Sequence, residues 1–149
     1  MRTYQGIARE KGKSIAVETA RAADLDGKLS LDQKRFRQVL GNLLDNAVKY
    51  SITNTTIRVD AAKVRNEAEI RVSNYSELRI SDRDRERIFE YGERGEESSR
   101  FNAPGTGIGL AVARDITEMH GGTIVVEESR RSGLGWQNTF LIRLPLSTE

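Results

Sequence analysis

Hydrophobic positions recur at helical spacing in the first half of the chain, between about Asp32 and Tyr50. Residues three and four apart share one face of a helix, so such a pattern is typical of an amphipathic helix packed on a core. Ser30 and Asp32 precede the pattern, and both are plausible N-caps. The predicted apolar face consists of Phe36, Val39, Leu40, Leu43, Leu44, Ala47 and Val48.

Short segments of alternating apolar and polar residues surround this helix. Such alternation is typical of half-buried strands. The last two predicted strands are joined by a loop that contains Gly133 and Gly135. The predicted strands are Ser14–Glu18, Thr56–Asp60, Glu69–Ser73, Thr123–Glu127 and Thr139–Arg143.

Two further helices are expected in the second half of the chain. Ser81 is expected to cap a short charged helix that ends near Phe89, and the polar stretch from Gly92 to Pro104 is expected to be a mobile loop. A longer helix follows Gly109 and should stop at Gly121. Its expected inner face consists of Leu110, Ala113, Ile116 and Met119.

These elements predict the fold class. Because the strands come in hairpin-like pairs, we expect an α/β protein with a mixed, mostly antiparallel sheet and helices on one face, a two-layer α/β sandwich. The chain has 149 residues, which fits one domain. We place this domain at residues 13–149 and interpret residues 1–12 as a linker or the tail of a preceding element.

Composition narrows the possible partners. The 24 basic residues nearly balance the 22 acidic ones, so the charge gives no reason to expect nucleic-acid binding. No apolar run approaches the roughly 20 residues that cross a bilayer, so we expect no membrane contact by this chain. The absence of cysteine excludes disulfides and thiolate chemistry and is compatible with a reducing compartment.

Polar residues that could bind a ligand lie beside the apolar face of the first helix. Asn42, Asn46 and Lys49 fall within an arc of roughly 60°. Asparagine is a poor helix former, its carboxamide oxygen can ligate Mg²⁺, and a lysine one turn further can meet a phosphate. Surface asparagines that bond only to water are the alternative.

A glycine cluster precedes the later helix. Gly105, Gly107 and Gly109 would let the backbone approach a ligand, and the free N–H groups of the helix that follows favour an anion. This arrangement suggests a phosphate site, and a flexible hinge is the alternative. The spacing fits neither the dinucleotide-binding fingerprint nor a P-loop.

These motifs resemble those of a known family. The string from Gln38 to Tyr50, which reads QVLGNLLDNAVKY, resembles the N box of histidine kinases. The string GTGIGLAVARDI from Gly105 to Ile116, continued by the MHGG sequence that ends at Gly122, resembles their second glycine box. Ile88–Glu90 with Arg94 resembles the Phe box, and FLIRLP at the end resembles the last strand.

The resemblance implies the Bergerat ATP-binding fold of the GHKL superfamily, with ATP and Mg²⁺ as ligands. It implies that Asn46 ligates Mg²⁺, that Asn42 lies beside the nucleotide and also touches the metal, and that Lys49 and Arg94 contact phosphates. The lid would run from Gly95 to Pro104. The implied nucleotide-binding residues are Asn42, Tyr50, Asn74, Ile80, Gly105, Thr106, Gly107, Ile108, Gly109 and Leu110.

Two features of the sequence depart from the motifs of related proteins. ATP-hydrolysing relatives carry a glutamate where this chain has Asn42, which cannot take a proton, so phosphoryl transfer is favoured over hydrolysis. The first glycine box is replaced by the stretch from Val72 to Ile80, which has Asn74 for aspartate, lacks both glycines and is one residue longer. A scaffold with weak or no ATP binding is therefore the rival function, and a serine kinase of the anti-sigma type is a second one.

The single histidine, His120, does not stand in a phosphoacceptor pattern, and a capping or structural role is expected for it. The resemblance then implies a separate dimerisation and phosphoacceptor domain in the same parent protein, whose last helix would end within residues 1–12. It also implies a downstream response regulator and a cytoplasmic location. We expect the fragment itself to be monomeric.

Overall fold

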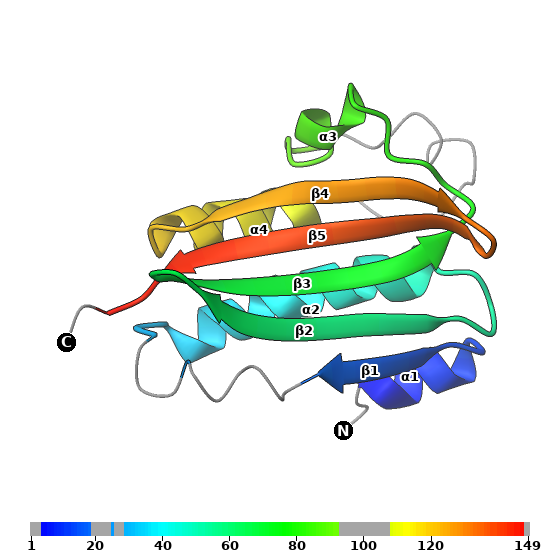
Figure 1. Ribbon diagram of the computed structural model, residues 1–149, viewed down its shortest axis with the longest axis horizontal. Helices are drawn as coiled ribbons and strands as arrows, with labels where there is room; N and C mark the ends of the chain where they lie inside the picture. The colour runs from blue at the N-terminus through cyan, green and yellow to red at the C-terminus, as the bar shows by residue number, and fades with distance from the viewer. Residues whose placement is uncertain (1–3, 19–24, 26–28, 93–107, 148–149) are drawn as a thin grey trace.

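A mixed sheet of five strands forms one layer of the protein, as a computed structural model that describes residues 4–18, 25, 29–92 and 108–147 shows (Figure 1). The strand order is β1-β2-β3-β5-β4. Strand β1 pairs parallel with β2, and the other pairs are antiparallel. The strands are β1 (Ser14–Glu18), β2 (Thr56–Val64), β3 (Glu67–Ser76), β4 (Thr123–Ser132) and β5 (Gly135–Pro145). All five predicted strands are confirmed, and the last four are longer than predicted.

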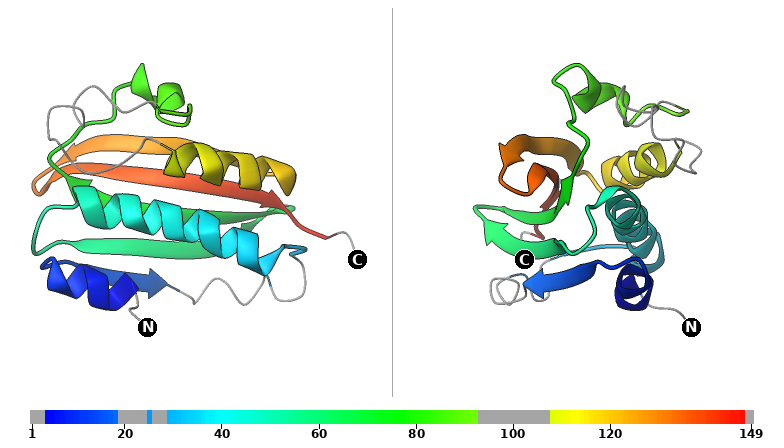
Figure 2. Two further views of the ribbon diagram at one scale, coloured as in Figure 1. Left: turned by 180° about the vertical axis from the view of Figure 1, so that it is seen from behind. Right: turned by 90° about the vertical axis from the view of Figure 1, so that its right-hand side faces the viewer.

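The helices α1 (Tyr4–Glu10), α2 (Gln33–Tyr50) and α4 (Gly109–Met119) form a second layer on one face of the sheet (Figure 2). The short helix α3 (Asp84–Arg87) lies beyond the β4 edge. The predicted two-layer α/β sandwich is therefore confirmed. No described helix is long and apolar enough to cross a membrane.

The helix ends follow from local capping. Asp32 caps α2, because its Oδ1 accepts from the backbone N–H of Arg35 at 3.1 Å. Ser81 Oγ accepts from the N–H of Asp84, the first residue of α3, at 3.2 Å, but Ser81 is not the N-cap that was predicted, because Arg83 stands at that position. Gly121 ends α4 with φ +75°, and the N–H of the following Gly122 bonds to Thr117 O. That last bond is the six-to-one contact of a Schellman motif, which satisfies a terminal carbonyl.

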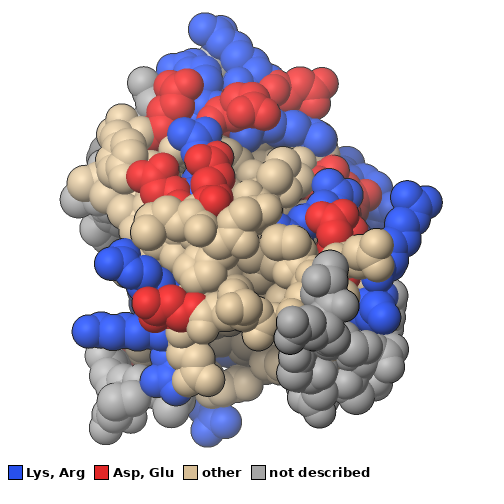
Figure 3. Space-filling view, turned by 90° about the vertical axis from the view of Figure 1, so that its left-hand side faces the viewer, with Lys and Arg blue, Asp and Glu red and all other residues tan. Residues whose placement is uncertain are grey.

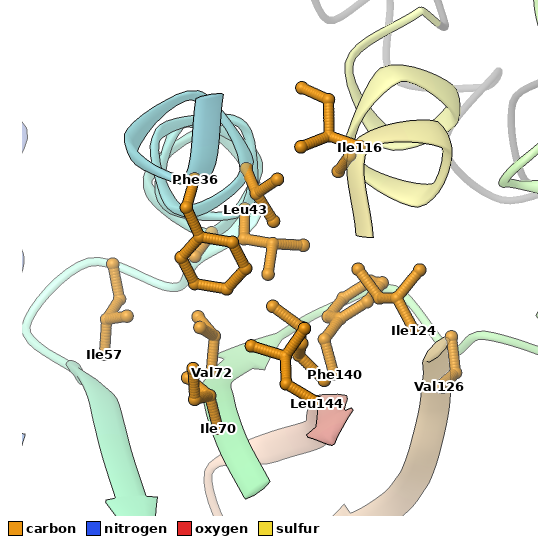
Figure 4. Close-up of a cluster of buried hydrophobic side chains, with 14 of the residues drawn as sticks. Phe36, Leu43, Ile57, Ile70, Val72, Ile116, Ile124, Val126, Phe140 and Leu144 are labelled. Atoms are coloured by element: carbon orange, nitrogen blue, oxygen red, sulfur yellow. The ribbon is translucent and has the colours of Figure 1, made fainter. Parts of the chain in front are cut away.

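The core lies between the two layers. Phe36 and Leu43 of α2 and Ile116 of α4 point toward the inward residues of the sheet, among them Val72 and Phe140 (Figure 4). On α2 the predicted face is confirmed, with Leu40 and Leu44 half-buried at its border. Burial of this apolar area is the main term that stabilises the two layers against each other.

Met119 was predicted on the inner face of α4, and this prediction is wrong, since the residue is 67% exposed. Steps of three residues lag a full helical turn by about 60° each, so three steps from Leu110 lead to the opposite side of the helix. The buried residues of α4 are Ala111, Ala113, Ile116 and Thr117.

Helix α1 occupies part of the segment that was interpreted as a linker or tail. Its Ala8 is fully buried in the common core. The hydroxyl of Tyr4 lies 2.5 Å from where a Cβ on Gly41 would stand, so this glycine makes room for α1 against α2. The domain boundary at residue 12 stays a prediction, although Ala8 shows that α1 packs on the same core.

The other face of the sheet carries paired charges instead of helices. The guanidinium of Arg71 donates to both carboxylate oxygens of Glu127, each at 2.8 Å. Glu69 is 8% exposed and accepts from Arg71 and from Arg143, each at 3.1 Å. These contacts raise the pKa of Arg71 and lower that of Glu127, in each case chiefly through their mutual hydrogen bond.

Charges of both signs are also mixed at one end of the molecule. The face in Figure 3 shows Lys and Arg side chains beside Asp and Glu around an uncharged centre.

Candidate functional site at the junction of α2, α4 and β3

Two hydrogen bonds fix how α4 lies along α2. His120 follows the end of α4, and its Nε2 accepts from the backbone N–H of Asp32 at 3.1 Å. Asn42 lies in the middle of α2, and its Nδ2 donates to the carbonyl of Gly109 at 2.9 Å. The helices are therefore antiparallel, and α4 begins beside the middle of α2.

Three predicted site residues lie on α2 beyond the point where α4 begins. Asn46 is one turn past Asn42, about 6 Å further along the axis, and Lys49 and Tyr50 follow. All three side chains are half-buried, and the ammonium of Lys49 lies 5.8 Å from the ring centroid of Tyr50. Because α4 is antiparallel, its N-terminus points toward this stretch of α2.

No side chain in the part of the protein that the structure describes caps the N-terminus of α4. Ile108 stands at the N-cap with no side-chain cap bond, and both Ile108 and Gly109 are exposed. The first N–H groups of a helix lack intrahelical partners and carry the positive end of its dipole. This end can therefore attract an anion such as a phosphate.

The C-terminal end of α2 is held by residues that the sequence analysis did not identify. Lys13 Nζ donates to the carbonyl of Val48 at 2.5 Å, and Ser51 Oγ donates to that of Ala47. A cation at this end of a helix satisfies a free carbonyl and complements the dipole. Burial, helped by Lys11, lowers the pKa of Lys13. Burial also raises the pKa of Asp45 beside Asn46, against the opposing charges of Lys49 and Lys11.

Strand β3 forms the floor of the site. Asn74 is 4% exposed and shares the inward face with Val72, because successive strand residues alternate between faces. The N–H of Ile52, just after α2, bonds to the carbonyl of Tyr75 at 2.8 Å. This bond holds the end of α2 against the end of β3, so Asn74, Tyr50 and Asn46 lie in the same region.

The stretch that replaces the first glycine box continues β3 as far as Ser76. Ser76 is fully buried, and Leu78 is 8% exposed. Neither residue has a positive φ, since among the described residues other than glycine only Asn54 and Arg65 do. The missing glycines therefore cause no left-handed strain. A glycine is needed instead on the partner strand, where a Cβ on Gly135 would stand 2.8 Å from the carbonyl oxygen of Ser76.

The segment that resembles the Phe box docks on α4 and β5. Phe89 is 2% exposed and packs edge-on against Phe140, with ring centroids 6.2 Å apart. The guanidinium of Arg114 lies 5.9 Å from the centroid of the Phe89 ring. The hydroxyl of Tyr91 donates to the carboxylate of Asp115, and this bond is the main cause that raises the pKa of Tyr91.

The structure therefore brings part of the predicted site together. Asn42 contacts the start of α4, Asn46, Lys49 and Tyr50 follow on α2, and Asn74 lies on the floor. Ile80 is half-buried, and its N–H bonds to Ser129, while Leu110 packs against the core. Arg94, Gly105, Thr106 and Gly107, and the whole of the predicted lid, lie outside the described residues.

The metal-ligating oxygens of the site suit a cation that is bound partly by the nucleotide. Within the described part of the chain, no group of three or more His, Cys, Asp or Glu side chains could hold a metal. Since Asn42 uses its Nδ2 on Gly109, its Oδ1 and that of Asn46 are the oxygens this helix offers. Mg²⁺ is usually held by one or two protein oxygens together with phosphates and water, which these residues fit.

Taken together, the uncapped helix end, the lysine and the carboxamides are the groups expected of a nucleotide-binding α/β sandwich. Comparison with known proteins agrees. Residues 31–148 match the family described as histidine kinase-, DNA gyrase B-, and HSP90-like ATPase. The chain belongs to this family.

The relatives assign the chain to the histidine-kinase branch. It is 31% identical over 153 aligned positions to the virulence sensor protein BvgS of Bordetella bronchiseptica, covering 99% of the chain and 12% of BvgS. It is 33% identical to the circadian input-output histidine kinase CikA of Synechococcus elongatus, covering 78% of the chain and 15% of CikA. The chain thus spans a small part of these relatives.

Solved structures share the fold. The nucleotide-free catalytic domain of the histidine kinase ThkA superimposes with a TM-score of 0.73 and 26% identity, covering 93% of this chain and 84% of that one. ThkA is also solved in complex with the response regulator TrrA, with a TM-score of 0.67, 24% identity and coverage of 92% and 35%. The chain is an ATP-binding catalytic domain of the histidine-kinase type.

Proposed function

We propose that the domain binds ATP with Mg²⁺ and transfers the γ-phosphoryl group to a histidine on a separate phosphoacceptor domain of the same parent protein. The observation that carries this proposal is the bond from Asn42 to the Gly109 carbonyl. It holds the positively polarised start of α4 beside Asn42, and Asn46 and Lys49 lie about one and two turns further along α2, where the phosphates of a nucleotide would lie.

Each residue of the site has a defined part in this proposal. The N–H groups at the start of α4 and the ammonium of Lys49 bind phosphate oxygens. Asn46 and Asn42 hold Mg²⁺ through their carboxamide oxygens, and the ion supplies charge neutralisation to the phosphates. Tyr50, Asn74 and Ile80 contact the nucleoside. Arg94, Gly105, Thr106 and Gly107, which precede Ile108 and Gly109, complete the phosphate side.

The chemistry needs little covalent help from this chain. An imidazole nitrogen of the acceptor attacks the γ-phosphorus, the bond from that phosphorus to the β,γ-bridging oxygen breaks, and ADP leaves with the electron pair. Positioning and charge stabilisation supply most of the rate in such transfers. Asn42 cannot accept a proton from water, which favours transfer to the imidazole over hydrolysis.

The partners follow from the family and not from this chain alone. The phosphoacceptor and dimerisation domain belongs to the parent protein, and a response regulator would receive the phosphoryl group next. The solved complex of ThkA with TrrA supports the second step for a relative. A cytoplasmic location of this domain fits such a pathway.

One observation favours a second candidate function. Ser76 and Leu78 replace the first glycine box and are both buried. Side chains at these places can narrow the space for adenine, and the domain would then act as a scaffold that binds ATP weakly or not at all.

Titration calorimetry with ATP and Mg²⁺ on three proteins separates the two functions: the parent, Asn74→Asp and Asn74→Ala. If Asn74 accepts a bond from the adenine amino group, aspartate should tighten binding about fivefold or more and alanine should weaken it, since charge-assisted bonds are roughly twice as strong. Equal affinity of all three proteins would show that Asn74 does not contact adenine. No binding to any of them at millimolar ATP would establish the scaffold.

A further inference from the structure

A chain of buried side-chain hydrogen bonds holds the segment from Ser76 to Ile80. Asn138 of β5 is 5% exposed, and its Nδ2 donates to the carbonyl of Leu78 at 2.9 Å. Ser129 of β4 donates through its hydroxyl to Asn138 Oδ1 at 2.6 Å. The N–H of Ile80 donates to the same Ser129 oxygen at 2.9 Å. Two residues of the segment are thus bonded to the β4–β5 hairpin.

The direction of every bond in this chain is determined. The Leu78 carbonyl can only accept, so Asn138 turns its amide nitrogen toward it and its Oδ1 toward Ser129. Ser129 Oγ therefore gives its hydrogen to Asn138 and accepts from the Ile80 N–H, which can only donate. The bond from the Leu78 N–H to Ser76 Oγ, at 3.0 Å, completes the arrangement. The N–H and carbonyl of Leu78, the N–H of Ile80 and the side chains of Ser129 and Asn138 thus all have partners, which is how such groups avoid a large desolvation cost.

The segment held in this way lies at the base-binding side of the proposed site. Asn138 is the direct cross-strand partner of Asn74, and both side chains are buried on the inward face of the sheet. Ile80, at the other end of the segment, is a further proposed nucleoside contact. These hydrogen bonds therefore tie Leu78 and Ile80, in the second half of the stretch that replaces the glycine box, to the β4–β5 hairpin.

We propose that Ser129 and Asn138 are positioning residues that shape the adenine side of the pocket, in place of the glycines that this chain lacks. They act through the segment from Ser76 to Ile80 and touch no phosphate. This inference rests on the proposed function. It adds that the β4–β5 hairpin, and not the local backbone of the segment, determines how the base is bound.

Ser129→Ala is the sharpest variant, because it removes the oxygen that serves both Ile80 and Asn138 and changes little else. Ser132→Ala is the matched control. Ser132 lies on the same strand, donates to Gly135 O at 2.9 Å and accepts from the Leu134 N–H at 3.2 Å. Within the described part of the chain, its side chain makes no hydrogen bond with Ser76–Ile80. Ser129→Thr keeps the hydroxyl and should restore the behaviour of the parent.

The first measurement is amide hydrogen exchange in the protein without nucleotide. Exchange at Ile80 should become about tenfold faster in Ser129→Ala and stay unchanged in Ser132→Ala and Ser129→Thr, since one net hydrogen bond corresponds to roughly that factor. Unchanged exchange at Ile80 in Ser129→Ala would overturn the structural part of the inference, whether or not the domain binds nucleotide.

The second measurement compares ATP with inorganic tripolyphosphate, both with Mg²⁺, by calorimetry or by competition. Ser129→Ala should raise the Kd for ATP about five- to tenfold and leave that for tripolyphosphate unchanged, because only the base side is altered. Equal weakening for both ligands would indicate a general loss of structure and overturn the positioning role. If the parent binds no ATP, the proposed function and this role fall together. If it binds ATP and Ser129→Ala binds equally well, only this inference fails.

Discussion

The amide nitrogen of Asn42 lies 2.9 Å from the carbonyl oxygen of Gly109, and this bond connects the two sequence motifs of the site. Asn42 was predicted to lie beside the nucleotide and to touch the metal. The structure assigns its Nδ2 to a different task, which is to hold the start of α4 against α2. Contact of Asn42 with the metal stays a prediction, and its Oδ1 is the atom that would make it.

Replacement of Asn42 by aspartate should loosen this contact. The variant keeps the shape but replaces the donor with an oxygen that faces the Gly109 carbonyl. We expect a loss of about 1 kcal/mol in the free energy of unfolding, measured by urea denaturation without nucleotide. Asn46→Asp is the matched control, since it adds the same charge one turn away, and a similar loss in both variants would contradict the role of the Gly109 bond.

Asn46→Ala should abolish the gain in ATP affinity that Mg²⁺ provides. Alanine has no oxygen for the ion, yet it is the better helix former by roughly 0.5 kcal/mol, so the fold should not be weakened. Calorimetric titration with ATP, in the presence and absence of Mg²⁺, measures this effect. The metal role of Asn46 is refuted if Mg²⁺ strengthens binding equally in the variant and the parent.

The chain alone should form no phosphohistidine. His120 is bonded through both ring nitrogens, with Nδ1 against the carbonyl of Ile116 at 2.8 Å and Nε2 against the N–H of Asp32. Incubation with γ-labelled ATP should therefore yield no acid-labile phosphate. Stoichiometric labelling of His120 would contradict this expectation.

His120 should also contribute to the stability of the fold. His120→Ala removes the acceptor for Asp32 and the edge-on ring contact with Phe36, whose centroid lies 6.3 Å away. A loss of about 1–2 kcal/mol in the free energy of unfolding is expected from thermal or urea denaturation. A change within about 0.3 kcal/mol would show that the contact between α2 and α4 does not depend on it.

The stability of the fold should fall in acid, because protonation of Glu127 breaks its ion pair with Arg71. Because the hydrogen bond lowers the folded-state pKa of Glu127 below its ordinary 4.5, the folded protein binds fewer protons than the unfolded chain. The contribution is complete above pH 4.5 and is lost as the pH falls through the folded value. The pair is partly exposed, so its size should stay below about 1 kcal/mol.

Glu127→Gln tests this pH dependence. The variant should be less stable than the parent at neutral pH and should lose less stability on acidification, as urea midpoints at a series of pH values would show. Glu118→Gln is a suitable control, because its carboxylate lies 4.0 Å from Arg114 in an exposed pair. If both variants keep the acid dependence of the parent, the assignment to Glu127 is wrong.

Gly122→Ala should be strongly destabilising. A Cβ at this position would stand 2.3 Å from the carbonyl oxygen of Arg143, and backbone cannot move aside cheaply. We expect a cost of about 1–3 kcal/mol or more in the free energy of unfolding. In Gly133→Ala, where a Cβ meets nothing within 4 Å, the change should be small. Equal effects of the two substitutions would contradict the close approach of this turn to β5.

The sequence by itself determined the elements and much of the site. The apolar face of α2, the cap at Asp32, the stop at Gly121 and the five strands all depend on neighbours a few residues apart. Such local periodicity and capping can be recognised in a sequence. The order and spacing of the N box and the second glycine box indicated the family, which the comparisons confirmed.

Only the tertiary structure decided which residues meet. Gly109 lies 67 positions from Asn42, and Leu78 lies 60 from its partner Asn138. No periodic pattern encodes such contacts, because they arise from the register of β3 with β5 and from the packing of α4 on α2. The sheet register also explains why the altered glycine box is unstrained. Its backbone follows β3 as far as Ser76, and side chains of the β4–β5 hairpin pair with the carbonyl of Leu78 and the N–H of Ile80.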